Sequence, residues 1–381
     1  MAMTPRAVGP AAVALLDSAT EALFMESETA LRRELEGCAA AAVVLLPWQN
    51  APQYVARDDG SVTSFLCSET VLNRLTAHRP DALPEQLCCL LLKAILSGNL
   101  LVDRLLIRQL PYPAGGIAAS DDESPTAVLM AHRGRVDHLR TALRYLPPSG
   151  ENGLAIRVGL DTEDPAPYRP LAASVSRVEF YRGIPAPAGP YAIRQKLAEL
   201  SPERLLMFHD SDDVSCTDRL SRLRPNMAAA ECGMIGCHEL VVDEIRSEVR
   251  AVRYPLDVSE ALRDGPHYSF LHGTSMIGRQ AFFAAGGFST DRIISCDTQF
   301  LYRAWFHMQI RNADDFLYIR RRHAESLTVQ GPTKIGSDFR RAIEQPWGPD
   351  FEAVKSGKLP LAKSTLMAVP GSAKHELVPL A

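Results

Sequence analysis

Apolar residues recur every three or four positions through most of the first 110 residues. This spacing covers Ala11–Glu36, Ser68–Ala77 and Pro84–Arg108, and it predicts amphipathic helices that pack by their apolar faces. One apolar, partly β-branched run, Ala41–Pro47, predicts a strand between them. We therefore expect residues 1–110 to form a mainly helical N-terminal region.

Beyond residue 126 the pattern changes to short apolar runs that alternate with amphipathic segments. The runs predict strands and the segments predict helices, and such alternation is typical of an α/β sheet with helical crossovers. The expected strands lie at 127–130, 154–160, 178–181 and 205–208, and the expected helices at 136–145, 191–200 and 216–223.

Turn-forming residues indicate where these units meet. Residues 111–125 combine Pro, Gly, Ser and acidic residues, which suits an exposed linker. Arg57–Gly60 also has the composition of a turn. Residues 126–330 would then form the α/β domain. Residues 331–381 contain scattered prolines and little periodicity, so we expect an extension that wraps the core or is partly disordered.

The composition is that of an ordinary globular protein, with 46% hydrophobic and 23% charged residues in a chain of 381. Lys and Arg (41) nearly balance Asp and Glu (45), so no strong field favours a nucleic-acid partner. Eight cysteines occur without a Cys-x-x-Cys pair. The most apolar stretch, Leu87–Ile107, carries charges that argue against a transmembrane segment, and the start of the chain does not resemble a secretory signal. We expect a cytoplasmic protein.

Three closely spaced acids, Asp210, Asp212 and Asp213, follow the apolar run Leu205–Phe208. Ligands of open α/β sheets gather at the carboxyl ends of the strands. Carboxylate oxygens suit a hard cation such as Mn²⁺ or Mg²⁺, which can also hold a diphosphate. The alternative is that these acids form a turn and cap the next helix. On this motif alone both interpretations stay open.

The acid motif is one of several motifs along the chain. Together they stand in the order found in family 2 of the GT-A glycosyltransferases, and the chain resembles that family. The resemblance implies a GT-A fold, which is a Rossmann-like, mostly parallel sheet flanked by helices. It is carried by the opening strand and turn (127–135), the helix start at 189–198, Asp-x-Asp-Asp (210–213), the segment ending in Gly-Gly-Phe (272–288), the acidic helix start (295–303) and the Arg/His strand that ends in Ser-Leu-Thr (318–328).

The resemblance assigns the donor side of the site to the ends of the expected strands. Asp161, with Asp164 in reserve, stands where the family places an acid against the nucleotide base. A carboxylate can accept a base N–H, although either acid could belong to a solvated turn. The implied metal ligands are Asp210, Asp212 and His323. The implied donor-binding residues are Ala131, His132, Arg133, Arg135, Asp161, Arg194, Asp210 and Ser211.

The later motifs supply the catalytic and acceptor sides. Asp297 occupies the position of the family's catalytic base, with a helix cap as the alternative interpretation. Cys296 stands where the family usually has Glu. Arg320–Arg322 could offset phosphate charge or form a solvated basic face. The implied acceptor-side residues are His272, Gly273, Thr274 and Cys296.

These assignments imply the inverting transfer of a sugar from a UDP, dTDP or GDP donor to an unidentified acceptor, which we expect to be a soluble small molecule of secondary metabolism. Asp297 would accept the acceptor's proton while the metal neutralises the leaving group. A catalytically silent glycosyltransferase-like binding or assembly protein stays open as an alternative. A nucleotidyltransferase is less favoured, because its Gly-x-Gly-Thr-Arg loop is not visible. The N-terminal region could form a homodimer or pack on its own domain.

Overall fold

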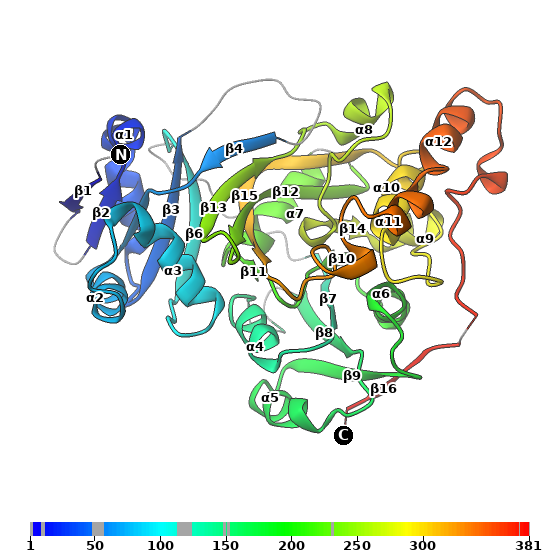
Figure 1. Cartoon of the computed structure of the whole chain (residues 1–381), viewed down its shortest axis with the longest axis horizontal. Coiled ribbons are helices and arrows are strands. Elements are labelled where there is room, and N and C mark those ends of the chain that lie inside the picture. The colour runs from blue at the N-terminus through cyan, green and yellow to red at the C-terminus, as the bar shows by residue number, and fades with distance from the viewer. Residues whose placement is uncertain are drawn as a thin grey trace.

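A mixed β-sheet flanked by helices forms the centre of the molecule in the computed structural model (Figure 1). The structure describes residues 3–8, 12–47, 57–112, 124–147, 150, 153–229, 232–372 and 374–380. Within these residues the sheet has eleven strands. Along one path they are β11 (Val214–Ser215), β15 (Ile310–Arg322), β12 (Met234–Asp243), β14 (Met276–Gly278), β10 (Leu205–Phe208), β7 (Thr126–His132), β8 (Leu154–Leu160), β9 (Val178–Ile184) and β16 (Glu376–Pro379). Off this path, β13 (Glu248–Arg253) pairs with β12, and β4 (Arg57–Ser61) pairs with β13.

The predicted α/β class is confirmed, and the four expected strands of the second half are present. They lie side by side in the order β10, β7, β8, β9, and all are parallel. All seven residues of β7 are buried, as expected for a strand that is covered on both faces. Because the strands are parallel, the residues that follow β7, β8 and β10 meet at one edge of the sheet.

Helices connect these strands and cover the sheet, as the alternating pattern predicts. The third expected helix begins at Arg219, three residues later than its predicted start. The helices are α4 (Val136–Arg144), α5 (Arg169–Ser174), α6 (Pro190–Leu200), α7 (Arg219–Ala229), α8 (Val258–Ala261), α9 (Arg279–Ala284) and α10 (Cys296–Ala304).

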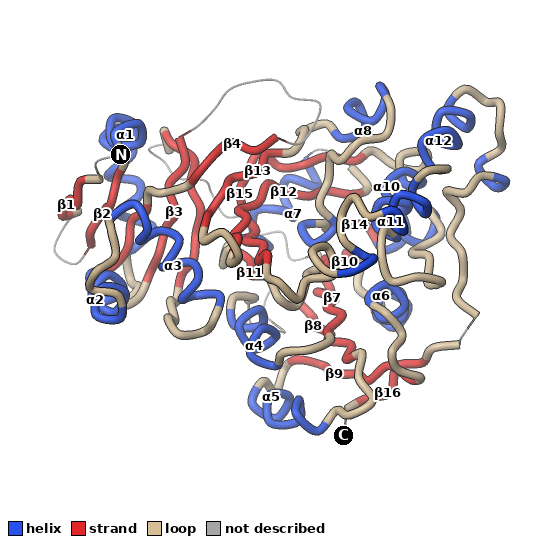
Figure 2. The backbone as a smooth tube through the Cα atoms, in the orientation of Figure 1, coloured by secondary structure: helices blue, strands red, loops and turns tan. Residues whose placement is uncertain are grey.

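The N-terminal region differs from the mainly helical expectation, because the described part of it contains a five-stranded sheet in addition to its helices (Figure 2). The order of the strands is β1 (Thr4–Ala7), β2 (Ala12–Leu16), β5 (Phe65–Ser68), β3 (Ala41–Pro47) and β6 (Arg104–Leu110). Its helices are α1 (Ser18–Leu35), α2 (Glu69–His78) and α3 (Leu87–Leu96).

The prediction is wrong here because short buried strands adjoin helices without a change in hydrophobicity. Strand β2 ends directly before Asp17, the cap of α1, so the two form one apolar stretch. Likewise β6 follows α3 after a short break, and the spacing of apolar residues predicts one helix over both. Only Ala41–Pro47 was correctly predicted as a strand. Such runs are ambiguous, since continuous apolar sequence suits a buried strand and a buried helix equally well.

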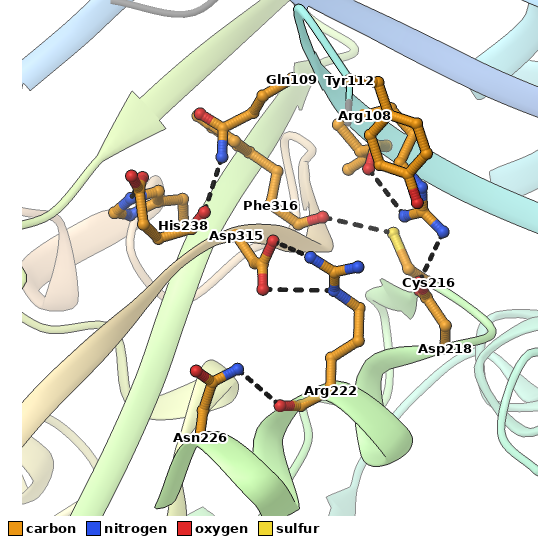
Figure 3. Close-up of polar contacts among 12 residues, drawn as sticks. Arg108, Gln109, Tyr112, Cys216, Asp218, Arg222, Asn226, His238, Asp315 and Phe316 are labelled. Atoms are coloured by element: carbon orange, nitrogen blue, oxygen red, sulfur yellow. Dashed lines mark hydrogen bonds and ion pairs between the residues drawn. The ribbon is translucent and has the colours of Figure 1, made fainter. Parts of the chain in front are cut away.

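The N-terminal region is joined to the α/β domain by β4, which belongs to the central sheet, and by a shared core. Strand β4 pairs with β13, whereas the sequence predicts a turn at Arg57–Gly60. Figure 3 shows a polar contact between the two parts, in which Arg108 of β6 binds Asp218. Beside it, Arg222 of α7 binds Asp315 of β15 within the α/β domain. One hydrophobic cluster includes Leu105 of β6 and Val128 of β7. The N-terminal region therefore packs directly on the α/β domain.

The C-terminal extension wraps the α/β domain. After η6 (Gly331–Thr333), it forms α11 (Asp338–Glu344), α12 (Trp347–Lys355) and η7 (Leu361–Lys363) before β16 pairs with β9 at the sheet edge. The predicted linker, residues 111–125, falls mostly outside the described residues. Among the helices that the structure describes, none combines the length and the apolar character that a membrane crossing requires.

We predict that Asp17→Ala destabilises the fold by about 1–2 kcal/mol, because Asp17 caps α1. Its carboxylate accepts hydrogen bonds from the Thr20 N–H at 2.8 Å and from the hydroxyls of Thr63 and Ser64. Thermal denaturation measures the change. Asp81→Ala, at an exposed position, is the control.

The same substitution should lose its effect at low pH. Burial alone would raise the pKa of Asp17, but the hydrogen bonds from Thr63 and Thr20 lower it below the ordinary value of 3.8. A lowered pKa in the folded state means that the stabilisation is complete above the ordinary pKa and is lost as the pH falls through the lowered one. A difference between variant and wild type that persists undiminished into strong acid would contradict this assignment.

Candidate active site

The acids that follow β10 are the centre of the candidate site. Asp210, Asp212 and Asp213 form a tight turn in which the Asp213 N–H donates to the Asp210 carbonyl at 3.2 Å. Asp213 is buried and accepts the backbone N–H of Arg321 at 2.7 Å. Burial and the charges of Asp212 and Asp210 raise the pKa of Asp213 well above its usual range. Asp213 therefore fixes the loop, whereas its two neighbours are partly exposed.

Asp212 faces the predicted histidine, which directly follows β15. His323 Nε2 lies 3.1 Å from Asp212 Oδ2, although the two residues are far apart in the sequence. Burial acts to raise the pKa of Asp212, but the hydrogen bond and the charge of His323 lower it. The ring of His138 packs edge-on against His323, with centroids 5.4 Å apart. The structure thus brings together two of the three predicted metal ligands.

Asp210 is bound by Arg194, the arginine that the resemblance placed on the donor side. Arg194 projects from α6, is buried, and donates to Asp210 Oδ1. Its guanidinium lies over the ring of Tyr191, 5.3 Å from the centroid. Burial raises the pKa of Asp210, and the charges of Asp212 and Asp297 act in the same direction, while Arg194 opposes them. Arg194 is therefore the counter-ion of this acid.

Asp297 lies in the first turn of α10, after Ser295 in the left-handed conformation (φ 59°). Among the described residues, its buried Oδ1 has no hydrogen-bond partner. Burial raises the pKa of the Tyr191 hydroxyl well above its usual range, and the charge of Asp297 adds to this effect. Arg194 contacts both Asp210 and the Tyr191 ring, and the charge of Asp297 acts on Tyr191 and on Asp210, so both carboxylates act on the same region.

The donor-side predictions divide into two groups. His132 is buried at the end of β7, and its Nδ1 lies 2.8 Å from Ser211 Oγ. Burial lowers the pKa of His132 to about 4, so the ring is neutral at pH 7. Ala131 is buried beside it. Arg133 and Arg135 are exposed in the turn that follows, and Arg135 pairs with Asp137.

Asp161 follows β8 and is almost fully buried. Its oxygens accept the backbone N–H groups of Ala188 at 2.6 Å and of Gly189 at 3.1 Å. It therefore fastens the loop before α6 to the end of β8. A role against the nucleotide base stays a prediction. The reserve residue, Asp164, is exposed and accepts the N–H of Ala166, which is the turn interpretation left open from the sequence.

The predicted acceptor-side residues lie between β10 and α10. Gly273 is packed so closely that a Cβ there would lie 2.8 Å from Tyr318 Oη and 3.1 Å from Asp210 Oδ2. His272 packs in an aromatic cluster, 4.6 Å from the ring of Phe208. The Thr274 hydroxyl donates to the Leu271 carbonyl. Burial raises the pKa of Cys296 to about 12, so this thiol is inert. Gly273 is the member of this group that touches the acid loop.

Two residues that were not identified from the sequence support the acid loop. Arg219 is 1% exposed and donates to the Phe208 carbonyl at 3.1 Å and to the Gly273 carbonyl at 3.0 Å. Its guanidinium lies over the ring of Tyr318, whose hydroxyl accepts the Asp210 N–H at 3.1 Å. The sequence gives no signal that Arg219 supports the acid loop, because its hydrogen-bond acceptors are backbone carbonyls.

The basic run of β15 is occupied by protein partners. Arg320 binds Glu239 through two hydrogen bonds, Arg321 donates to the Leu96 carbonyl, and Arg322 pairs with Asp243. These contacts favour a structural role over the phosphate contact considered from the sequence. The guanidinium charge of Arg320 still acts to lower the pKa of Asp210.

The side chains of the acid loop suit a metal ion that is bound by only a few protein ligands. In the part of the chain that the structure describes, no three His, Cys, Asp or Glu side chains converge on one point. Mg²⁺ is commonly held by one or two carboxylates together with water and substrate phosphates. Asp210 and Asp212 offer such oxygens, and their mutual repulsion is what a cation would relieve. His323 adds an imidazole beside them.

A hollow between the two sheets lies away from the acid loop. This cavity of about 220 Å³ is lined by Asp17, Leu45, Val62 and Phe316, among others. The two oxygens of Asp17 there are already used to cap α1 and to bind the hydroxyls of Thr63 and Ser64. The acid loop and this cavity are therefore separate features.

No protein-family model matches the chain, and no curated protein matches it. Among solved structures, S. aureus TarS 1-349 in complex with UDP-GlcNAc is similar, with a TM-score of 0.45 and 12% identity. The match covers 58% of this chain and 64% of that one, which is less than two thirds of its length. The complex of the same fragment with UDP gives a TM-score of 0.41 and 11% identity over 62% of this chain and 73% of that one. Because these similarities are low, any function must rest on the residues of this chain.

The Gly-Gly-Phe turn is held by buried polar side chains. Arg303 of α10 donates to the carbonyls of Ala285, Gly287 and Leu366. Gln195 of α6 accepts the Phe288 N–H at 2.9 Å. These bonds tie the helix that carries Arg194 to the helix that carries Asp297.

We predict that Gly287→Ala destabilises the protein more than Gly286→Ala does. Both glycines have positive φ, at 63° and 85° respectively, so alanine at either position costs about 1–2 kcal/mol. At Gly287 the added Cβ would also collide with Gln195 Oε1 and break its bond to Phe288. The nearest atom to a Cβ at Gly286 is Arg303 Nε, at 3.6 Å. Urea denaturation ranks the two variants, and equal midpoints would show that the Gln195 contact contributes nothing.

Proposed function

We propose that the chain is a metal-assisted, inverting glycosyltransferase that uses a nucleoside diphosphate sugar. The observation that supports this proposal best is that Asp210, which Arg194 binds, and the buried oxygen of Asp297 both belong to the surroundings of Tyr191 and Arg194. One carboxylate belongs to a loop that can hold a cation, and the other has a buried oxygen without a partner among the described residues. Glycosyl transfer needs these two functions, a site for the leaving group and a base.

On the donor side, Asp210 and Asp212 would hold the cation, with His323 beside them. A bound Mn²⁺ or Mg²⁺ would neutralise the charge that develops on the diphosphate. Arg194 would keep Asp210 ionised and oriented, since it is buried against that carboxylate. The neutral His132 would bind through hydrogen bonds rather than through charge. Its Nε2 is buried and, within the described residues, unpaired.

On the acceptor side, Asp297 would act as the general base. Its Oδ1 would accept the proton of the acceptor hydroxyl as that oxygen attacks the anomeric carbon. Attack on the face opposite the leaving group inverts the configuration, through a transition state with oxocarbenium character. The left-handed Ser295 and the buried Arg303 fix α10, so that Asp297 is held in one place.

We predict that Asp297→Asn lowers turnover about 10²–10⁴-fold and leaves donor binding unchanged, because only the proton acceptor is removed. The assay measures the nucleotide that is released when a panel of UDP, dTDP and GDP sugars undergoes hydrolysis or sugar transfer. Asp291→Asn is a matched control in the loop before α10, where Asp291 pairs with Arg292. Full activity of Asp297→Asn would remove this residue from the mechanism.

We predict that Asp212→Asn weakens the binding of Mn²⁺ in the presence of UDP, because a neutral amide replaces a negative ligand. Electron paramagnetic resonance of free Mn²⁺ reports the bound fraction directly and does not depend on activity. Asp164→Asn, in the exposed turn after β8, is the control. If both variants bind Mn²⁺ as tightly as the wild type, Asp212 is not a ligand.

A further inference from the structure

One buried carboxylate close to the candidate site, that of Glu239, plays no part in the proposed mechanism. Glu239 of β12 is 0% exposed. It accepts hydrogen bonds from Arg320 at 2.7 and 2.9 Å and from the Tyr254 hydroxyl at 2.6 Å. Burying a carboxylate is costly unless it is paired and fully bonded, so this arrangement requires its partners to be held together.

A local irregularity of β12 directs Glu239 towards these partners. The pairing of β12 with β15 shifts register on both sides of His238. The neighbouring side chains His238 and Glu239 are both fully buried and polar. His238 binds Asp314 on one side and accepts the Tyr254 N–H on the other. Such bulges often re-aim a side chain beside a functional site.

The hydrogen-bonded network of Arg320, Glu239 and Tyr254 ends at the exposed residue Tyr268. The Tyr254 hydroxyl lies 3.2 Å from the Tyr268 hydroxyl, and the two rings meet edge to face with centroids 5.6 Å apart. Tyr268 is nevertheless 53% exposed. Its hydroxyl end is thus held by Tyr254, while about half of the residue's surface is exposed to solvent. A large aromatic surface held in one orientation loses little entropy when a ligand packs on it.

The network reaches the acid loop through β15, because Arg320 stands two residues from Tyr318 and their side chains share one face of the strand. The Tyr318 hydroxyl accepts the Asp210 N–H at 3.1 Å. Burial raises the pKa of the Tyr268 hydroxyl to about 12, and the charges of Glu239 and Asp297 add to that effect, while Arg320 opposes it. Arg320 also acts on the pKa of Asp210. Tyr268 therefore lies within the electrostatic reach of Asp297 and shares Arg320 with the acid loop.

We propose that Tyr268 is a stacking platform for a sugar ring of the acceptor, and that Glu239 and Tyr254 are positioning residues that hold it. The apolar C–H face of a pyranose packs on an aromatic ring, and the hydroxyl groups at its edge bind polar side chains. Tyr268 supplies the ring. Glu239 is fully buried and bonded to its partners, so within this pair only Arg320, whose side chain is 26% exposed, can offer polar N–H groups to a ligand. The acceptor class is thus a carbohydrate or glycoside. The inference rests on the proposed function, because it places the acceptor at Asp297.

Saturation-transfer NMR tests the inference without requiring activity. The probes are the methyl glycosides of glucose, galactose, mannose and N-acetylglucosamine and their β-1,4-linked disaccharides, with phenol and methyl benzoate as aromatic competitors. We expect at least one glycoside to bind wild-type protein. Tyr268→Ala should weaken that binding about tenfold, which corresponds to about 1.4 kcal/mol of stacking. Tyr254→Phe should weaken it less, because the Tyr268 ring remains but is no longer held.

The control is Phe339→Ala, which removes an equally exposed aromatic ring from α11. It should leave glycoside binding unchanged. The inference is overturned if no glycoside binds, if Tyr268→Ala binds glycosides as well as the wild type does, or if only the aromatic competitors bind. Thermal shift with UDP and Mn²⁺ on the same variants separates this inference from the proposed function. Donor binding that persists while glycoside binding is independent of Tyr268 would refute the platform alone.

Discussion

The repulsion among the carboxylates at the end of β10 is the constraint on which the rest of the site depends. Three acids within four positions repel one another unless cations or hydrogen-bond donors surround them. Arg194 binds Asp210, His323 binds Asp212, and the backbone N–H of Arg321 binds Asp213. These partners come from α6, from β15 and from the residue that follows β15, so the acid loop brings together elements that are distant in the sequence. A divalent cation would complete this balance of charge.

The position of Asp297 depends on a different set of contacts, made largely by the C-terminal extension. Gln299 donates to the carbonyls of Thr365 and Met367, and Arg303 donates to that of Leu366. Both side chains project from α10, which begins with the candidate base. The extension was expected to wrap the core, and its contribution is that it fixes the helix of Asp297. The extension residues that hold this helix thus lie outside the segment that resembles the glycosyltransferase family.

The central strands were predicted well from the sequence, because each is a local apolar run. Closely spaced acids and a family motif singled out the acid loop and Arg194, whose roles stay predictions. The N-terminal sheet was missed because β2 and β6 adjoin helices in continuous apolar sequence. Arg219 and Glu239 were missed for another reason. Their partners are backbone carbonyls or side chains from remote strands, and such contacts exist only after the chain has folded. Whether Asp164 forms a turn or contacts the nucleotide base likewise depends on contacts that form only in the folded chain.

The central claim is that the acid loop binds a nucleoside diphosphate through a divalent cation. Isothermal titration calorimetry of UDP, dTDP and GDP into the protein, with Mn²⁺ and then with EDTA, tests it most directly. We expect one of these nucleotides to bind with a stoichiometry of about one when Mn²⁺ is present, and chelation to abolish the binding, because Asp210 and Asp212 repel a bare diphosphate. Binding of equal strength in EDTA, or none to any of the three with Mn²⁺, would contradict the claim.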